Sequence, residues 1–184
     1  MGLDMYLSRK LYVKRWEHKG DDNFTVTVKK KNKKYPGVNP DRISHIVEEA
    51  MYWRKANQIH KWFVENVQDG EDDCKEYWVS AEDLIRLREL CKQVIDIAIV
   101  EDGKMEDGYT FNEAGEKVYN YRDGKVIRNA EEVAELLPAQ SGFFFGSTGY
   151  DQWYLHDVQK TYDRLVELDL ENNTEWGYRY QSSW

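Results

Sequence analysis

Residues 52–63, YWRKANQIHKWF, constrain the fold of this chain more than any other stretch. Apolar side chains recur there at intervals of three and four residues, which is the period of an α-helix with one buried face. We therefore predict a helix over residues 50–67 that packs one face into the core. The predicted buried stripe is Tyr52, Ala56, Ile59, Phe63 and Val67.

Aromatic and polar side chains flank this stripe in two rows at four-residue spacing. Indole rings stack on flat partners, and cationic side chains pair with phosphate or carboxylate, so the rows suit an anionic aromatic ligand. The competing interpretation is structural, because Trp beside extended cationic chains is common at the rim of a core. His60 lies at the edge of the stripe, where a hydrogen-bonded core histidine is the ordinary finding. The rows are Trp53, Asn57 and Lys61, and Arg54, Gln58 and Trp62.

Length and composition bound the class of protein. A chain of 184 residues, 41% of them hydrophobic, can bury a core as one domain spanning residues 1–184. The formal net charge of −8 argues against general nucleic-acid binding, although a local basic patch is compatible with it. Cys74 and Cys91 lack the spacing of a metal or redox site, so we predict two plain thiols, no metal and no cofactor. No apolar run is long enough for a membrane span, so we expect a cytoplasmic protein that does not bind membranes.

The first third of the chain predicts strands. Apolar and polar residues alternate over residues 3–13, and again over 24–28, so we predict two strands that pair antiparallel. The lysine run at 29–34 is typical of a solvated turn, with phosphate binding as the alternative. Residues 41–49 favour a strand that leads into the predicted helix, although a helix also fits their pattern.

The later elements predict a single-domain α+β fold, with a mainly antiparallel sheet, about three long helices and a hairpin-rich insertion. A short strand over 77–79 precedes a Ser80–Asp83 capping box that opens a helix. Asp-Gly turns at 102, 107 and 123 mark the insertion, residues 101–128. Asn129 caps a helix over 130–137, and residues 176–180 form the last strand. The predicted core includes Leu7, Ile59, Phe63, Leu87, Val94, Phe144 and Leu165.

A second informative stretch is SGFFFGSTGYDQWY at residues 141–154. Three consecutive phenylalanines at 143–145 favour a strand buried on both faces. The strand is followed by a glycine-flanked hydroxyl loop with Ser147 and Thr148, and then by a helix that opens near Asp151. This arrangement presents free backbone N–H groups to an anion, although Asp151 either repels the anion or caps the helix. The stretch lacks the Gly-Lys-Ser/Thr of a nucleotide-triphosphate loop.

Three segments together resemble a set of small proteins from phage and prophage genomes. They are MGLDMY at the start, YWRKANQIHKWFVENVQDG from residue 52, and LLPAQSGFFFGSTGYDQWY from residue 136. The resemblance spans the chain but brings no catalytic residue or ligand to any position. It implies an accessory phage protein made in the bacterial cytoplasm, in a class that includes inhibitors of host defence.

We expect a non-enzymatic binder of a small anionic, nucleotide-like ligand, for instance a sponge that sequesters a host signalling molecule. The first alternative is a hydrolase or transferase on a phosphorylated or nucleotide substrate, with His60, His156 or Asp151 as acid or base. The second is a protein-binding module anchored by some of its seven Trp and 13 Tyr. The same aromatic content predicts a homo-oligomer. The candidate binding residues are Trp53, Arg54, Asn57, His60, Lys61, Trp62, Ser147, Thr148, Tyr150 and Trp153.

The binding hypothesis joins the two informative stretches in one pocket. Arg54 or Lys61 supplies a charge, the loop supplies N–H and hydroxyl groups, and Trp53 or Trp62 covers the base. Arg54 lies opposite the buried stripe of its predicted helix. It therefore reaches the loop only if a neighbouring subunit or the hairpin insertion folds over it.

Overall fold

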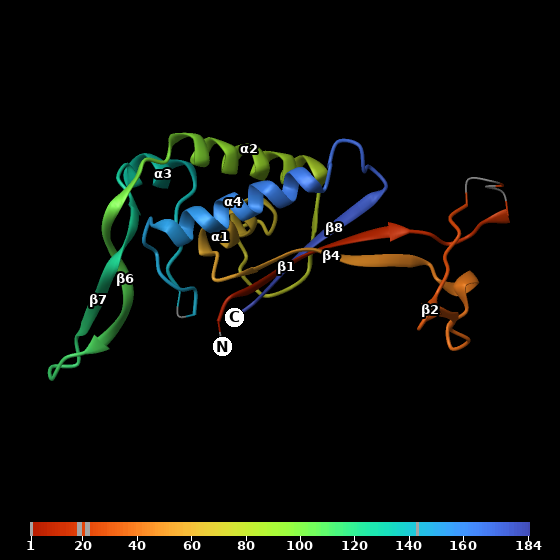
Figure 1. Ribbon diagram of the computed structural model, residues 1–184, viewed down its shortest axis with the longest axis horizontal. Helices are drawn as coiled ribbons and strands as arrows, with labels where there is room; N and C mark the ends of the chain where they lie inside the picture. Colours follow the sequence, from red (N-terminus) through yellow and green to blue (C-terminus); the bar gives the residue numbers. More distant parts are fainter. Residues whose placement is uncertain (1, 18–19, 21–22, 143) are drawn as a thin grey trace.

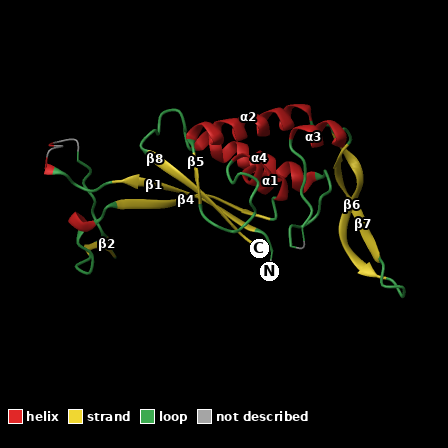
Figure 2. Cartoon of the chain, turned by 180° about the vertical axis from the view of Figure 1, so that it is seen from behind, coloured by secondary structure: helices red, strands yellow, loops and turns green. Residues whose placement is uncertain are grey.

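The structure is a computed structural model that describes residues 2–17, 20, 23–142 and 144–184 (Figure 1). Four strands form an antiparallel sheet in the order β4-β1-β8-β5, and Figure 2 shows the main helices together on one side of it. The strands are β1 (Asp4–Tyr12), β4 (His45–Arg54), β5 (Tyr77–Val79) and β8 (Trp176–Ser183). The helices are α1 (Asn57–Asn66), α2 (Ala81–Ile97), α3 (Ala130–Leu136) and α4 (Gln152–Glu167).

Two hairpins extend from opposite ends of this body (Figure 1). The first, β2 (Lys29–Lys30) and β3 (Lys33–Lys34), lies in the connection between β1 and β4 and is followed by a 3₁₀ turn at Pro40–Arg42. The second is the long pair β6 (Val100–Phe111) and β7 (Lys117–Ile127). The predicted α+β class with a mainly antiparallel sheet is confirmed. None of the described helices is long and apolar enough to cross a membrane.

Alternation along β1 confirms the predicted first strand. Met5 and Leu7 are fully buried, while Tyr6 between them is 40% exposed. The second strand predicted over 24–28 is wrong, because these residues form no strand and β1 pairs with β4 and β8. A short Val and Thr run has strand propensity, but β4 offers β1 a longer ladder and buried side chains.

The predicted helix over 50–67 is wrong at its start. The strand predicted over 41–49 exists as β4 but continues to Arg54, and α1 begins only at Asn57. Met51 and Trp53 are buried at alternating positions of that strand. Lys55 then adopts a left-handed backbone with φ of 60°, which separates the strand from the helix. The sequence here fits both the helical period and the two-residue period of a strand, and pairing with β1 stabilises the strand.

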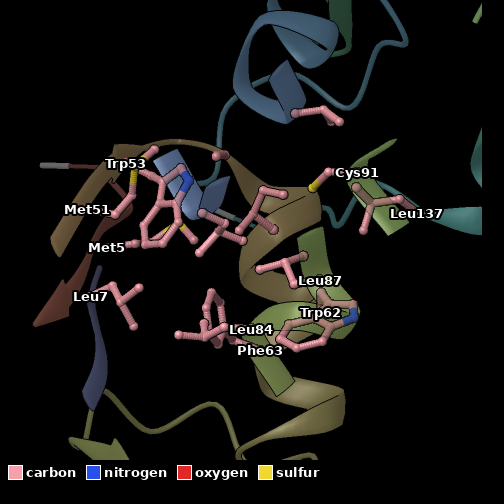
Figure 3. Close-up of a cluster of buried hydrophobic side chains, with 14 of the residues drawn as sticks. Met5, Leu7, Met51, Trp53, Trp62, Phe63, Leu84, Leu87, Cys91 and Leu137 are labelled. Carbon is pink, nitrogen blue, oxygen red and sulfur yellow. The ribbon is translucent and has the colours of Figure 1, made fainter. Parts of the chain in front are cut away.

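Phe63 lies at the centre of the core, where α1 meets the sheet (Figure 3). Its side chain is fully buried, and its ring stacks on that of Tyr180 with centroids 3.9 Å apart. Trp53 and Trp62 meet the Phe63 ring edge-on at 5.9 and 5.2 Å. One aromatic cluster therefore joins α1 to both β4 and β8. The other predicted core residues that are buried are Leu7, Ile59, Leu87, Val94 and Leu165.

The strand predicted over 143–145 is wrong where the chain is described. Phe144 and Phe145 lie in a loop, and Phe143 lies outside the described residues. Phe145 is the buried ring of this loop, whereas Phe144 is only partly buried, so its place in the predicted core is also wrong. The Phe144 carbonyl accepts the Leu3 N–H at 3.1 Å, but the edge strands of the sheet are β4 and β5, so this bond does not make the described part of the run a strand.

The elements between α1 and α4 follow the prediction with two corrections. The capping box at α2 is confirmed, since the Asp83 N–H donates to Ser80 Oγ at 3.0 Å. The insertion is one long hairpin, in which Gly103 and Gly124 face each other across the ladder instead of forming turns. Asn129 precedes α3 as predicted, but its Oδ1 accepts the Ile99 N–H at 2.9 Å instead of capping that helix.

Phe63→Ala is expected to lower the free energy of unfolding by about 3–5 kcal/mol, because it leaves a cavity beneath three aromatic rings. Chemical denaturation measures the loss. Phe111→Ala is the matched control, since Phe111 is 63% exposed on the hairpin and should change stability by no more than about 0.5 kcal/mol. Equal effects of the two substitutions would contradict the assigned core.

Candidate functional site

A cleft lies between the β6–β7 hairpin and the loop at residues 141–149, which we call the glycine loop. Figures 1 and 2 show the position of the hairpin beside the body. Its volume is about 690 Å³, within the range of small-molecule binding sites. Aromatic rings, two lysines, one carboxylate and several hydroxyl groups line it. The lining residues are Lys55, Glu106, Gly108, Tyr109, Lys117, Tyr119, Tyr121, Ser141, Gly142, Phe144, Gly146, Ser147 and Thr148.

The register of the hairpin places its tyrosines on one face. Tyr109 pairs directly with Tyr119, and Glu106 pairs with Tyr121, so these side chains share one side of the ribbon. The rings of Tyr109 and Tyr119 lie 6.2 Å apart, and Lys117 Nζ lies 4.4 Å from the centre of the Tyr109 ring. This face is exposed to solvent but turned toward the glycine loop. It offers flat surfaces with a cation beside them.

The side-chain amide of Asn57 fixes the glycine loop from below. Its Nδ2 donates to the carbonyl groups of Phe145 and Ser147 at 3.1 and 2.8 Å. Its Oδ1 accepts the backbone N–H of Gln140 at 3.0 Å. Asn57 is 2% exposed, so these bonds are shielded from water and satisfy backbone groups that no secondary structure pairs. The predicted ligand residue Asn57 thus holds the wall of the cleft.

Lys55 reaches the cleft from the turn between β4 and α1. Its backbone N–H donates to the Leu3 carbonyl at 2.8 Å, which holds the turn against the N-terminal strand. Its side chain lies over Gly146, where a Cβ atom would stand 3.2 Å from Lys55 Cβ. Gly146 also has a φ of 90°, a conformation that favours glycine, and a side chain there would press on the lysine stem. The close approach brings the lysine stem along the loop.

The two walls of the cleft meet at the start of α4. The Ile127 N–H at the base of the hairpin donates to the Tyr150 carbonyl at 2.9 Å. Gln152 Oε1 accepts the Lys125 N–H at 3.1 Å. Ser147 Oγ donates to Glu106 Oε2 at 3.3 Å across the opening. The hairpin is therefore held at its base, and the Ser147–Glu106 hydrogen bond joins it to the glycine loop further along its length.

The helix N-terminus next to the loop carries its own cap. Asp151 Oδ1 accepts the N–H groups of Trp153 and Tyr154 at 2.8 and 3.2 Å. The N–H groups predicted to be free at this end are therefore occupied. Of the two roles predicted for Asp151, repelling an anion or capping the helix, the structure shows the cap. Recognition of an anion in the cleft falls instead to side chains.

The structure separates the cations predicted for the shared pocket from the glycine loop. Arg54 is exposed and is absent from the cleft lining. Lys61 pairs with Glu65 at 3.7 Å, and it borders a smaller surface depression that Trp62 and Gln58 also line. Lys55 takes the place predicted for Arg54, because the chain turns between the strand and the helix at that residue.

The aromatic residues predicted to bind the ligand lie in different parts of the structure. Trp53 is 1% exposed, and its Nε1 donates to Thr161 Oγ1 at 2.7 Å within the core. Tyr150 accepts the Ala139 N–H at 3.0 Å through its hydroxyl, which braces the segment before the glycine loop. Trp153 is 53% exposed on α4, outside the cleft lining. Only Ser147 and Thr148 of the ten predicted residues line the cleft.

Lys55, Lys117 and the hairpin tyrosines were not among the residues predicted from the sequence. One signal was present: Tyr109 and Phe111, and Tyr119 and Tyr121, each stand two residues apart, the spacing of side chains on one face of a strand. The length of the hairpin was hidden by its Asp-Gly pairs, which have the composition of turns.

His60 has a structural place. It is fully buried, with Nδ1 2.8 Å from the Tyr180 hydroxyl and Nε2 3.0 Å from Asp72 Oδ2. Asp72 Oδ1 also accepts the Trp184 Nε1–H at 2.9 Å. The chain of bonds ties α1, the turn after it and the C-terminal strand together. His60 does not line the cleft, and neither does His156.

The chain matches no protein-family model, no curated protein and no solved structure.

Asn57→Ala is expected to release the glycine loop, because it leaves three backbone groups without partners and costs about 2–4 kcal/mol. Hydrogen exchange of the amides at 141–149 should accelerate more than exchange in α2. Asn66→Ala is the matched control at the other end of α1, where the amide makes a single bond to the Trp62 carbonyl. Unchanged exchange of the loop in Asn57→Ala would contradict the role assigned to this amide.

Burial raises the pKa of Asp157 on α4 to about 6. The folded state therefore binds this proton more tightly than the unfolded state, and stability falls as the pH rises from about 4 to 6. Asp157→Asn removes the cost of ionisation and should stabilise the protein by about 1–3 kcal/mol near pH 8, with little gain near pH 4. Thermal unfolding at both pH values measures the difference. A gain that is equal at both would refute the assignment.

Proposed function

We propose that the protein is a non-enzymatic binder of a small anionic, nucleotide-like ligand, which it holds in the cleft between the hairpin and the glycine loop. The single observation that carries the proposal is the composition of the cleft. Tyrosine rings stand next to Lys117 on one wall, and Lys55 and three hydroxyl groups line the other. A ligand with a flat ring and a phosphate matches that arrangement.

Each part of such a ligand has a partner in the lining. The base stacks on Tyr109 or Tyr119, whose rings are 47% and 46% exposed. A phosphate group pairs with Lys55 and accepts hydrogen bonds from Ser147 and Thr148. Glu106 would repel a phosphate, so it faces the sugar or the amino group of a base, which donate to a carboxylate. The hydrogen bond between Ser147 and Glu106 opens to admit the ligand.

The lining favours binding over catalysis. Among its described residues there is no histidine or cysteine. Ser147 Oγ bonds to the Glu106 carboxylate at 3.3 Å and to the Gly149 N–H at 3.0 Å. A serine nucleophile is ordinarily activated by a closely bound base that is itself oriented by a third group. The hydrolase or transferase alternative has no such constellation here.

The resemblance to phage and prophage proteins suggests a biological role for a protein that binds a ligand without catalysing a reaction. A protein that holds a host nucleotide signal tightly lowers its free concentration and acts as a sponge. The cleft wall formed by a hairpin attached at its base suits such a role, because a small shift of the ribbon toward the loop would cover the ligand. The predicted homo-oligomer is part of the same proposal.

A protein-binding role is the second candidate. The observation in its favour is the exposure of the ribbon, on which Phe111 and Tyr121 are 63% and 62% exposed. Aromatic side chains at such positions are typical anchors of interfaces. Under this alternative, the hairpin would lose exposure on meeting a protein, and no small molecule would copurify.

The proposal is tested by mass spectrometry of small molecules released when the protein, purified from bacterial lysate, is denatured. Isothermal titration with nucleoside monophosphates, nucleoside triphosphates and cyclic mono- and dinucleotides then gives the affinity. We expect at least one of these compounds to copurify or bind. No released compound and no heat of binding across the set would refute the function.

Lys55→Gln is expected to weaken binding about tenfold or more, because it removes one charge-assisted hydrogen bond and keeps the side-chain stem. Lys61→Gln is the matched control, since it removes the same charge from α1 outside the cleft. Tyr119→Ala should also weaken binding, whereas Val118→Ala, on the opposite face of the ribbon, should not. Equal losses in each variant and its control would place the ligand elsewhere.

A further inference from the structure

The connection between β1 and β4 spans residues 13–44, and its described residues, 13–17, 20 and 23–44, project from the sheet at the end opposite the β6–β7 hairpin (Figure 1). We call it the basic arm. It holds nine of the 26 Lys and Arg residues of the chain but only four of the 34 Asp and Glu residues. Its formal charge is therefore +5 in a protein of net charge −8. Positive charge is concentrated on one projection of an acidic body.

The tip of the arm brings five lysines together. Lys29 pairs with Lys34, and Lys30 with Lys33, directly across the β2–β3 ladder. The two residues between them, at 31 and 32, have φ of 50° and 62°, the conformation of a tight two-residue turn. Like charges in directly opposed positions destabilise a hairpin. No ion pair joins these lysines to any described residue, so the repulsion is not offset within that part of the chain.

Exposed aromatic rings accompany the lysines. Trp16 and Tyr35 are each 39% exposed, and Phe24 is 42% exposed. Lys14 Nζ lies 4.6 Å from the centre of the Trp16 ring, and Lys30 Nζ lies 5.8 Å from that of Tyr35. A base stacked on either ring would therefore carry its phosphate next to an ammonium group. Rings and cations in alternation are what single-stranded nucleic acids bind.

We infer that the basic arm binds single-stranded nucleic acid. The lysines at 29–34 pair with successive phosphates, and Trp16 and Tyr35 stack on bases. Phosphates between the opposed lysines relieve the repulsion across the β2–β3 ladder, which favours the bound state. A duplex keeps its bases stacked on one another and offers these rings no free face. The acidic body repels a polyanion, so binding is confined to the arm and is compatible with the negative net charge.

The inference is tested by fluorescence anisotropy of a labelled oligothymidine of about 15 nucleotides with the full-length protein, at salt concentrations from about 50 to 200 mM. The same sequence as RNA, the matching DNA duplex and poly-glutamate serve as competitors. We expect the single strands to bind and to compete better than the duplex or poly-glutamate. Absence of binding at the lowest salt, or equal competition by poly-glutamate, would overturn the inference.

The double variant Lys30→Ser, Lys33→Ser removes one opposed lysine pair and should fold at least as well as the original chain, because it relieves repulsion. It should weaken oligothymidine binding about tenfold at low salt and reduce the slope of log K against log salt by about 1.4. The control, Lys104→Ser with Lys125→Ser, removes the same charge from the other hairpin and should retain the affinity. Equal losses in both double variants would refute the assignment to the arm.

Trp16→Ala and Tyr35→Ala separate stacking from charge. Each should weaken oligothymidine binding at least fivefold, with an unchanged salt slope. Val47→Ala, an exposed apolar side chain on β4 outside the arm, should retain the affinity. Retained affinity in both aromatic variants would overturn the single-strand assignment. Nucleotide binding in the cleft is measured separately, so the failure of one proposal leaves the other standing.

Discussion

The hydrogen bonds of the buried Asn57 amide hold together the part of the molecule on which the function depends. Among its described residues the glycine loop has no strand or helix, and the carbonyl groups of Phe145 and Ser147, together with the N–H of the preceding Gln140, bond to this side chain. An unpaired buried backbone group costs about 1–3 kcal/mol, so the loss of these bonds would destabilise the loop, which the Leu3 N–H also holds through the Phe144 carbonyl at 3.1 Å. Because Asn57 is the first residue of α1, the same turn that begins the helix also sends Lys55 across the loop.

The position of Asn57 depends in turn on how firmly α1 is packed. The Phe63 ring stacks on Tyr180, and His60 bonds to the hydroxyl of the same tyrosine, so two side chains one helical turn apart fix the helix against β8. The hairpin wall is anchored separately, because Ile127 at the end of β7 bonds to Tyr150 and Gln152 at the start of α4 bonds to Lys125. The cleft thus has one wall fixed by the core and one held mainly at its base, with the Ser147–Glu106 hydrogen bond across the opening, an arrangement that permits closure over a ligand.

Most of the elements could be predicted from sequence, but their junctions could not. The cap formed by Ser80 and Asp83 is local, and the sequence predicts α2 correctly from it. At residues 50–54 the strand and helix periods coincide, and the choice is made by pairing with β1, a contact far away in the sequence. The error misplaced the predicted cation, because the sequence analysis named Arg54 or Lys61, whereas Lys55 at the junction lines the cleft. The hairpin tyrosines were missed for a related reason. The Asp-Gly pairs at Gly103 and Gly124 have the composition of turns, and only the pairing of β6 with β7 shows that they lie inside strands.

The central claim is that the hairpin and the glycine loop form a single binding site. A crystal structure of the protein with the compound released from it, or with the nucleotide that binds most tightly, tests the claim most directly. The account predicts density for a flat ring against Tyr109 or Tyr119 and for an anionic group within hydrogen-bonding distance of Lys55 Nζ. An empty cleft in a crystal where the same compound occupies another surface would contradict it.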